Sequence, residues 1–311
     1  MADHDPHHVD PGDEGRHPPE DDPLWNESVY LDFVAGDGTL AGYARIGLYP
    51  NLGVTWWTTV VVGGDRPLVH SVAFDLPVPG TGWALGGEGT DLWFEVVEPL
   101  ATVRLRGTAP AGLHADPTAV YRGESGEPTT LGLDLTWVTD GTPFAYDVTT
   151  RYEIPCVVAG SVVVGDQRLE VDGHGQRDHS WGVRDWWSFG WCWSAARLDD
   201  GTRVHLTDVR IPGLRTAIGY RQAGGVVTPL TGGRVDEEPG PEGLPRRATA
   251  TLEPAGLTLD IEPIAFGPVL LVADDGRESR FPRAVARFTT ADGRTGTGWI
   301  EWNQPPAAPP A

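Results

Sequence analysis

Residues 173–193 read GHGQRDHSWGVRDWWSFGWCW, and this segment combines more indoles and charged side chains than any other in the chain. Tryptophan provides a large rigid apolar surface with one N–H donor. Ionisable groups held against such a surface lose solvent, and their pKa values shift. Two interpretations follow. The segment either forms a site for acid–base chemistry or ligand binding, or it contains ion pairs that fix a loop in the core.

Outside this segment the chain consists of short runs of β-branched and aromatic residues, such as 54–62, 131–138 and 204–209. Asp-Gly pairs separate many of them and supply the positive φ angles of tight hairpins. Sustained helical periodicity is missing, and 41 Gly and 28 Pro would interrupt it. The pattern predicts an all-β, antiparallel sandwich or barrel with few helices.

The chain divides by composition. Residues 1–23 carry many acidic groups and almost no apolar ones, which predicts a disordered acidic tail. We expect an N-terminal β domain over residues 24–162 and a C-terminal β domain over 163–303 that carries the RDHSWG block. A Pro/Ala tail over 304–311 is also expected to be disordered.

Composition excludes several functions. The formal charge of −21 argues against nucleic acid and anionic membrane surfaces as partners. The chain has no lysine, which excludes Schiff-base chemistry and the P-loop lysine, and no GxGxxG motif, so no cofactor is expected. Neither a signal peptide nor an apolar run long enough to span a membrane is visible, which predicts a cytoplasmic protein without integral membrane contact.

Acid–base candidates lie in the central segment. On an extended strand Asp178 points to one face while Arg177 and His179 point to the other. Desolvated by indoles, Asp178 would keep its proton nearer neutral pH and donate it to a weak acceptor. If Arg177 or Arg184 instead forms a salt bridge with it, the pKa of Asp178 falls and the acid role is lost.

Two other chemistries fit the segment less well. The sequence around Ser180 half-matches the GxSxG nucleophile elbow, but Asp178 replaces the first glycine and no helix follows. His174 and His179 are five residues apart and would face opposite sides of one strand, so no metal site is predicted.

Further candidates extend the site. If residues 191–198 pair with 203–209, His205 lies near Trp191 or Trp193, although an ordinary surface histidine is the alternative. Near the C-terminus Trp299 shares a strand face with Glu301, which is either a second carboxylate for the site or a rim residue. The complete set of candidate ligand-binding residues is Arg177, Trp181, Arg184, Trp187, Trp191, Trp193, His205, Trp299 and Glu301.

These motifs resemble the carotenoid 1,2-hydratase/AttH-like family. The similarity lies in Gly173-x-Gly175, Asp178-His179-x-Trp181-Gly182, Gly190-Trp191-x-Trp193 and Leu198-x-Asp200-Gly201. Asn26-Glu27-Ser28, Arg45-Ile46-Gly47 and Glu301-Trp302-Asn303 look like a branch frequent in actinobacteria. The resemblance implies two tandem lipocalin-like β-barrel domains and cofactor-independent handling of an apolar polyene or terpenoid. Residues 184–187 depart from the hydratase pattern.

The resemblance makes Asp178 the candidate general acid. We therefore expect a hydro-lyase, cyclase or isomerase acting on an isoprenoid, steroid or polyketide-like molecule in a Trp-lined cavity. His179 and Asp185 are further catalytic candidates. The alternative is a non-catalytic carrier in which arginines and tryptophans bind a hydrophobic or acidic lipid.

Overall fold

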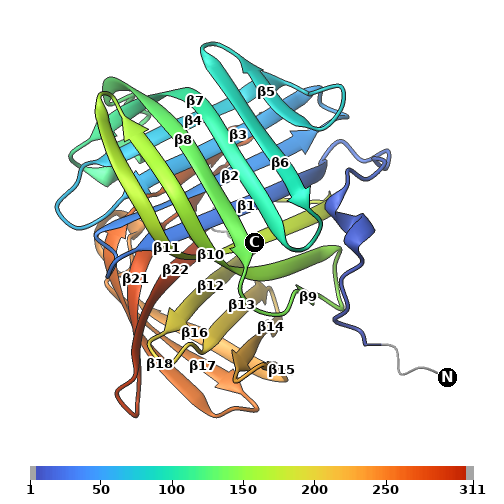
Figure 1. Cartoon of the computed structure of the whole chain (residues 1–311), viewed down its shortest axis with the longest axis vertical. Helices are drawn as coiled ribbons and strands as arrows, with labels where there is room; N and C mark the ends of the chain where they lie inside the picture. Colours follow the sequence, from blue (N-terminus) through green and yellow to red (C-terminus); the bar gives the residue numbers. More distant parts are fainter. Residues whose placement is uncertain (1–4, 306–311) are drawn as a thin grey trace.

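The computed structural model describes residues 5–305, and its regular structure is almost entirely antiparallel β (Figure 1). The helical elements of these residues are three short 3-10 helices, η1 (Pro11–Glu14), η2 (Pro117–Arg122) and η3 (Pro241–Gly243). None of the helices found there is long and apolar enough to cross a membrane. The cytoplasmic location stays a prediction.

Eleven strands form the first sheet. They are β1 (Trp25–Ala35), β2 (Leu40–Tyr49), β3 (Val54–Val62), β4 (Leu68–Pro77), β5 (Trp83–Gly87), β6 (Thr90–Glu98), β7 (Thr102–His114), β8 (Glu127–Thr139), β9 (Phe144–Ala145), β10 (Arg151–Val164) and β11 (Gln167–Val183). Their order is β4-β3-β2-β1-β11-β10-β8-β7-β6-β5, with β9 beside β10. Because β4 also pairs with β7, the sheet closes into a barrel.

Nine strands form the second, curled sheet, in the order β15-β14-β13-β12-β22-β21-β18-β17-β16. They are β12 (Gly190–Leu198), β13 (Arg203–Ile211), β14 (Leu214–Ala223), β15 (Val226–Pro229), β16 (Gly232–Glu238), β17 (Arg247–Glu253), β18 (Leu257–Phe266), β21 (Arg283–Thr290) and β22 (Thr295–Asn303). A separate hairpin pairs β19 (Val269–Val272) with β20 (Glu278–Phe281). The expected pairing of residues 191–198 with 203–209 is confirmed.

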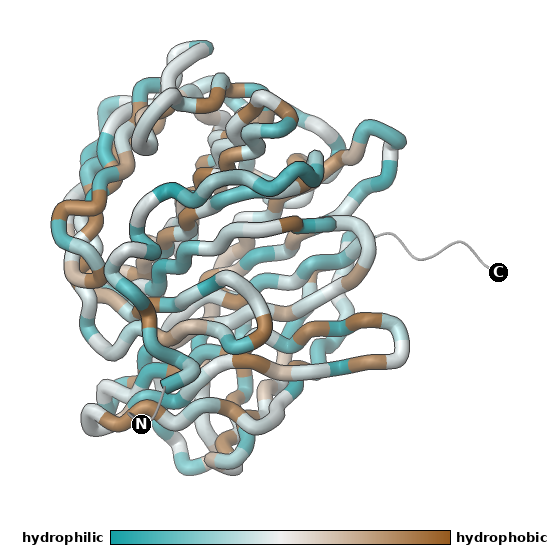
Figure 2. Tube along the Cα trace, turned by 90° about the vertical axis from the view of Figure 1, so that its right-hand side faces the viewer, coloured by the Kyte–Doolittle hydropathy of each residue, from teal (hydrophilic) through white to brown (hydrophobic). Residues whose placement is uncertain are grey.

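Hydrophobic residues are spread over both sheets in short stretches that alternate with hydrophilic ones (Figure 2). Strand β1 is buried along its whole length because both of its faces are covered. Val29, Leu31 and Phe33 point into the first barrel, whereas Tyr30 and Val34 pack against the second sheet. This all-β architecture with few helices agrees with the predicted lipocalin-like fold.

The strands change sheet at a different place from the predicted domain boundary. Position 162/163 falls inside β10, and β11, which carries the RDHSWG block, pairs with β1 and β10 of the first sheet. The second sheet begins only at β12. Composition gave no signal for this, because β10 and β11 continue the β pattern without a linker.

The segment before β1 also differs from the expected disordered tail. Within described residues 5–23, Val9 belongs to the core of the first barrel, and Glu14 is buried. An oxygen of Glu14 accepts from Nη1 of Arg177 at 2.8 Å, and both side chains are nearly inaccessible. The acidic composition concealed a buried ion pair that anchors the segment to β11. Residues 1–4 and 306–311 of the two predicted tails lie outside the described residues.

We predict that Glu14→Gln destabilises the fold by about 3–5 kcal/mol, because it leaves a buried guanidinium without its counter-charge. Urea denaturation measures this loss. Exposed Glu20→Gln is the matched control in the same segment and should stay within about 0.5 kcal/mol of the wild type. Equal stability of the Glu14 variant would show that the segment does not hold the barrel.

Candidate active site between the two sheets

A cavity of about 590 Å³ lies where the outer face of the first sheet meets the second sheet. Its lining comes from β1, β2, β10, β11, β12, β13, β14, β21 and β22 and from the loops beside them. The interior of the first barrel is filled by its own apolar core. The Trp-lined cavity expected inside a barrel is therefore found between the two sheets.

Asp178 faces this cavity from β11, as strand alternation predicts. Its Oδ2 accepts from Nη2 of Arg151 at 2.7 Å, and the same guanidinium reaches Glu153 at 2.8 Å. The ion pair that the sequence placed with Arg177 or Arg184 is thus made with Arg151. It is a single contact rather than a two-oxygen fork, and Oδ1 has no hydrogen-bond partner among residues 5–305.

Asp178 and Glu153 differ in their affinity for a proton. Burial raises the pKa of Asp178 to about 7; the guanidinium of Arg151 opposes the shift and the carboxylate of Glu153 adds to it. Burial acts upward on Glu153 too, but His205 and Arg151 hold its pKa below the usual value. Two neighbouring carboxyl groups whose pKa values are pushed apart are the typical arrangement of an acid–base site. Asp178 is the member that retains a proton.

Three indoles wall the cavity. Trp191 and Trp193 point into it from β12, and Trp186 reaches it from the loop after β11. Trp193 donates its Nε1–H to Glu153 at 3.0 Å, and Trp191 donates to Glu301 at 3.0 Å. Because these N–H groups are bound in the wall, the indole faces are left as the apolar surface offered to a ligand.

Glu301 lines the cavity as a further carboxylate, in addition to Asp178 and Asp185. It lies on β22 beside Trp193 and forms an ion pair with Arg283 from β21. Arg283 also lies over the rings of Tyr30 and Tyr43, with its guanidinium carbon 4.9 and 4.3 Å from their centroids. These contacts fix Glu301 as part of a rigid wall.

Six of the sequence-predicted residues line the cavity: Asp178, Arg184, Asp185, Trp191, Trp193 and Glu301. Asp185 accepts from the backbone N–H of Trp187 and from the hydroxyl of Ser188, and these hydrogen bonds lower its pKa although burial acts upward. It is therefore an ionised residue of the lining rather than a proton donor.

Three predicted residues lie on the opposite face of β11, inside the first barrel. Arg177 pairs with Glu14, and Trp181 stacks on the ring of His17 at 3.7 Å between centroids. His179 is buried there among Trp83 and Trp181. The two-residue period of the strand separates them from Asp178.

The remaining three are near the cavity without lining it. His205 is buried behind the wall, with Nε2 2.6 Å from the hydroxyl of Tyr146. Trp299 is buried between the sheets and donates to the carbonyl of Phe33 at 3.1 Å. Trp187 lines a separate surface groove.

Several cavity residues were not identified from the sequence as site residues. They are Ser28, Tyr30, Arg45, Tyr146, Val148, Thr149, Arg151, Ser180, Val183, Trp186, Phe189, Thr207, Val209, Ile211, Thr216, Ile218 and Arg283. Alternation along β11 could have placed Ser180 on the face of Asp178, whereas Ser28 and Tyr30 reach that face only through the pairing of β1 with β11. Arg151 and Arg283 lie opposite Ser180 and Glu301 in the β10–β11 and β21–β22 hairpins, so the turns at residues 165–166 and 292–293 were the signal that could have placed them.

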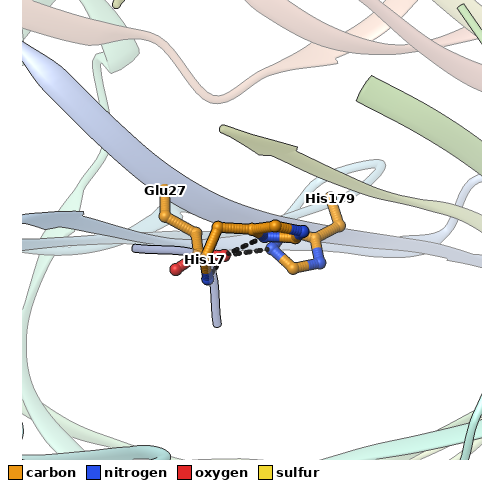
Figure 3. A group of neighbouring side chains, drawn as sticks. All are labelled: His17, Glu27 and His179. Atoms are coloured by element: carbon orange, nitrogen blue, oxygen red, sulfur yellow. Dashed lines mark hydrogen bonds and ion pairs between the residues drawn. The ribbon is translucent and has the colours of Figure 1, made fainter. Parts of the chain in front are cut away.

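His17, Glu27 and His179 form a second group of polar residues (Figure 3), and none of them lines the cavity. Oε1 of Glu27 is 2.8 Å from Nδ1 of His17 and 3.1 Å from Nε2 of His179. It also accepts the backbone N–H of His17 at 2.9 Å. Two histidines and a carboxylate could hold a divalent metal ion. Here the carboxylate oxygen already serves three neighbouring nitrogens, so the group is also satisfied as a hydrogen-bonded cluster.

The raised pKa of Asp178 predicts a pH dependence of stability. Below about pH 3.9, the pKa of an unfolded Asp, the folded and the unfolded chain both hold the proton. In that range this group makes no contribution to the pH dependence of the free energy of unfolding. As pH rises to about 7 the folded state keeps a proton that the unfolded chain releases, so the free energy of unfolding falls. Chemical denaturation from pH 4 to 8 should therefore show the wild type losing stability relative to Asp178→Asn.

Asp91→Asn, at an exposed position of β6, is the matched control for this titration. The opposite slope, with the wild type gaining on Asp178→Asn as pH rises, would mean that the ion pair with Arg151 keeps Asp178 charged.

Comparison with solved structures shows the same fold. An AttH-like protein of Nitrosomonas europaea superposes with a TM-score of 0.65 at 14% identity, over 96% of this chain and 97% of the other. CghA superposes with a TM-score of 0.60 at 12% identity, over 93% of this chain and 90% of CghA. Kievitone hydratase from Nectria haematococca superposes with a TM-score of 0.60 at 11% identity, over 89% of this chain and 88% of the hydratase.

No curated protein matches the sequence. The actinobacterial branch stays a prediction. A family model, described as the domain of unknown function DUF7064, matches residues 10–306. The chain belongs to the DUF7064 family.

Proposed function

We propose that this protein is a cofactor-independent lyase or isomerase that acts on a largely apolar small molecule bound between the two sheets. The observation that carries the proposal is Asp178, a buried acid with a pKa of about 7 that shares a cavity lining with three indoles. Two proteins of the same fold support it: one is named kievitone hydratase, and the other, CghA, has been solved with the small molecule Sch210972.

The proposed chemistry begins with proton transfer. Asp178 donates its proton to an alkene or carbonyl of the substrate, and the positive charge that develops is stabilised by the faces of Trp191 and Trp193. The resulting carboxylate is held by Arg151. It recovers a proton either from the rearranged substrate, which gives isomerisation or cyclisation, or from a water that adds to the cation, which gives hydration. Asp178 is regenerated in each case.

The cavity also acts by its shape. Its walls come from two packed sheets, so it can hold a flexible substrate folded with its reacting atoms close together. An isoprenoid, steroid or polyketide-like ligand is the class that the sequence predicts, and the apolar part of the lining fits all three. Which of them is bound, and whether water adds, remain predictions.

A non-catalytic carrier is the second candidate. The contact between Asp178 and Arg151 favours it, because an acid held permanently in an ion pair cannot donate a proton. The two candidates differ in one result: a carrier binds the ligand and returns it unchanged.

We predict that Asp178→Asn lowers turnover by about 100-fold to 10,000-fold, the usual contribution of a general acid. Asparagine resembles the neutral acid in shape, so folding and ligand affinity should change little. Product formation is followed by mass spectrometry and NMR on a panel of sesquiterpenoid to triterpenoid and polyketide-like compounds. Unchanged turnover would remove Asp178 from the chemistry, and no turnover of any compound by the wild type would favour the carrier.

We predict that Trp193→Ala weakens binding of a neutral polyene, methyl parinarate, by about tenfold, because it removes a large apolar wall. Probe fluorescence measures the dissociation constant. Trp193→Phe keeps a smaller aromatic face and loses the N–H donated to Glu153, so it should bind more tightly than the alanine variant. Trp93→Ala, at an exposed tryptophan of β6, is the control. Unaltered affinity in Trp193→Ala would place this indole in the ordinary core.

A further inference from the structure

The cavity is lined by four guanidiniums, which is notable in a chain of net charge −21. Two of them are neutralised locally: Arg151 contacts Asp178 and Glu153, and Arg283 contacts Glu301. The other two, Arg45 and Arg184, form no ion pair with any residue between 5 and 305. Buried or half-buried charges are normally paired, so Arg45 and Arg184 lack the counter-charge that such groups usually have.

Both unpaired guanidiniums lie over one indole. The guanidinium carbons of Arg45 and Arg184 are 4.8 and 5.5 Å from the ring of Trp186. Their hydrogen bonds are long: Arg45 donates to Asn26 at 3.3 Å, and Arg184 donates to Ser180 at 3.4 Å. Two like charges around one ring repel each other, and most of their N–H groups have no hydrogen-bond acceptor within residues 5–305.

The local backbone leaves room for this arrangement. A Cβ atom at Gly47, two residues along β2, would lie 2.5 Å from Nη1 of Arg45. Glycine at this position therefore allows the guanidinium to lie flat against the strand. Burial lowers the pKa of Arg184 to about 10, and the charges of Arg151 and Arg45 act in the same direction. An anion bound to the two arginines would offset this repulsion between like charges.

We propose that Arg45 and Arg184 form an anion subsite that binds the carboxylate of an otherwise apolar substrate. Guanidinium groups offer parallel N–H donors that match two carboxylate oxygens. Trp186 supports both arginines, while the apolar body of the ligand extends toward Trp191 and Trp193. This inference rests on the proposed function, since it requires a ligand in the cavity, and it narrows the substrate class to an acidic lipid, terpenoid or polyketide.

The subsite would also act on the general acid. The positive charges of Arg184 and Arg45 favour the ionised form of Asp178. A bound carboxylate neutralises them, so Asp178 keeps its proton to higher pH once the substrate is in place. An acidic substrate would thereby help to maintain the proton donor in its reactive state, whereas a neutral analogue would not.

The test compares cis-parinaric acid with its uncharged methyl ester, methyl parinarate, by fluorescence titration of the full chain. The wild type should bind the acid about tenfold or more tightly than the ester. Arg184→Gln and Arg45→Gln should each weaken binding of the acid by about tenfold and leave binding of the ester unchanged. Gly47→Ala, which keeps both charges but displaces the Arg45 guanidinium, should weaken the acid selectively as well.

Arg168→Gln, on an exposed turn-proximal position of β11, is the control and should affect neither probe. Equal binding of acid and ester that is unaffected by Arg184→Gln would overturn the anion subsite and leave the apolar cavity standing. If neither probe binds, or if Trp193→Ala changes the affinity for neither probe, the proposed ligand cavity is wrong and the anion subsite is wrong with it.

Discussion

Residues 175–180 of strand β11 are buried on both faces of the strand, and the two-residue period determines what each of these side chains can do. Arg177 and His179 point into the first barrel, where they meet Glu14 and Glu27. Asp178 points the other way, into the space between the sheets. One strand thus ties the N-terminal segment to the barrel and also presents the buried acid to the cavity. A shift of register by one residue would exchange these roles.

The electrostatics of the cavity follow from this placement. Asp178 shares a single guanidinium with Glu153, and His205 and two hydrogen-bond donors keep Glu153 ionised. Because Arg151 interacts with two acids, its charge only partly opposes the effect of burial, and the pKa of Asp178 is raised. Four arginines line this cavity in an otherwise acidic protein, and two of them form the proposed anion subsite.

The sequence was sufficient for the features that depend on local pattern. The Asp-Gly turns and β-branched runs predicted the all-β fold, and alternation placed Asp178 opposite Arg177 and His179. It could not show that β11 joins the first sheet, because pairing between β1 and β11 links residues about 150 positions apart in the chain. For the same reason the contact of the buried Glu14 with Arg177 was missed. Arg151 and Arg283 face the site across hairpins and could have been found from the turn positions.

The central claim is that the ligand site lies between the two sheets, with Asp178 at the reacting atoms. A crystal structure of the protein soaked with acidic isoprenoid or polyketide-like ligands tests it most directly. The account predicts ligand density against Trp191 and Trp193, with a carboxyl oxygen of Asp178 within about 3 Å of an unsaturated carbon or its oxygen. Density inside the first barrel or in the surface groove at Trp187, with the space beside Asp178 unoccupied, would contradict it.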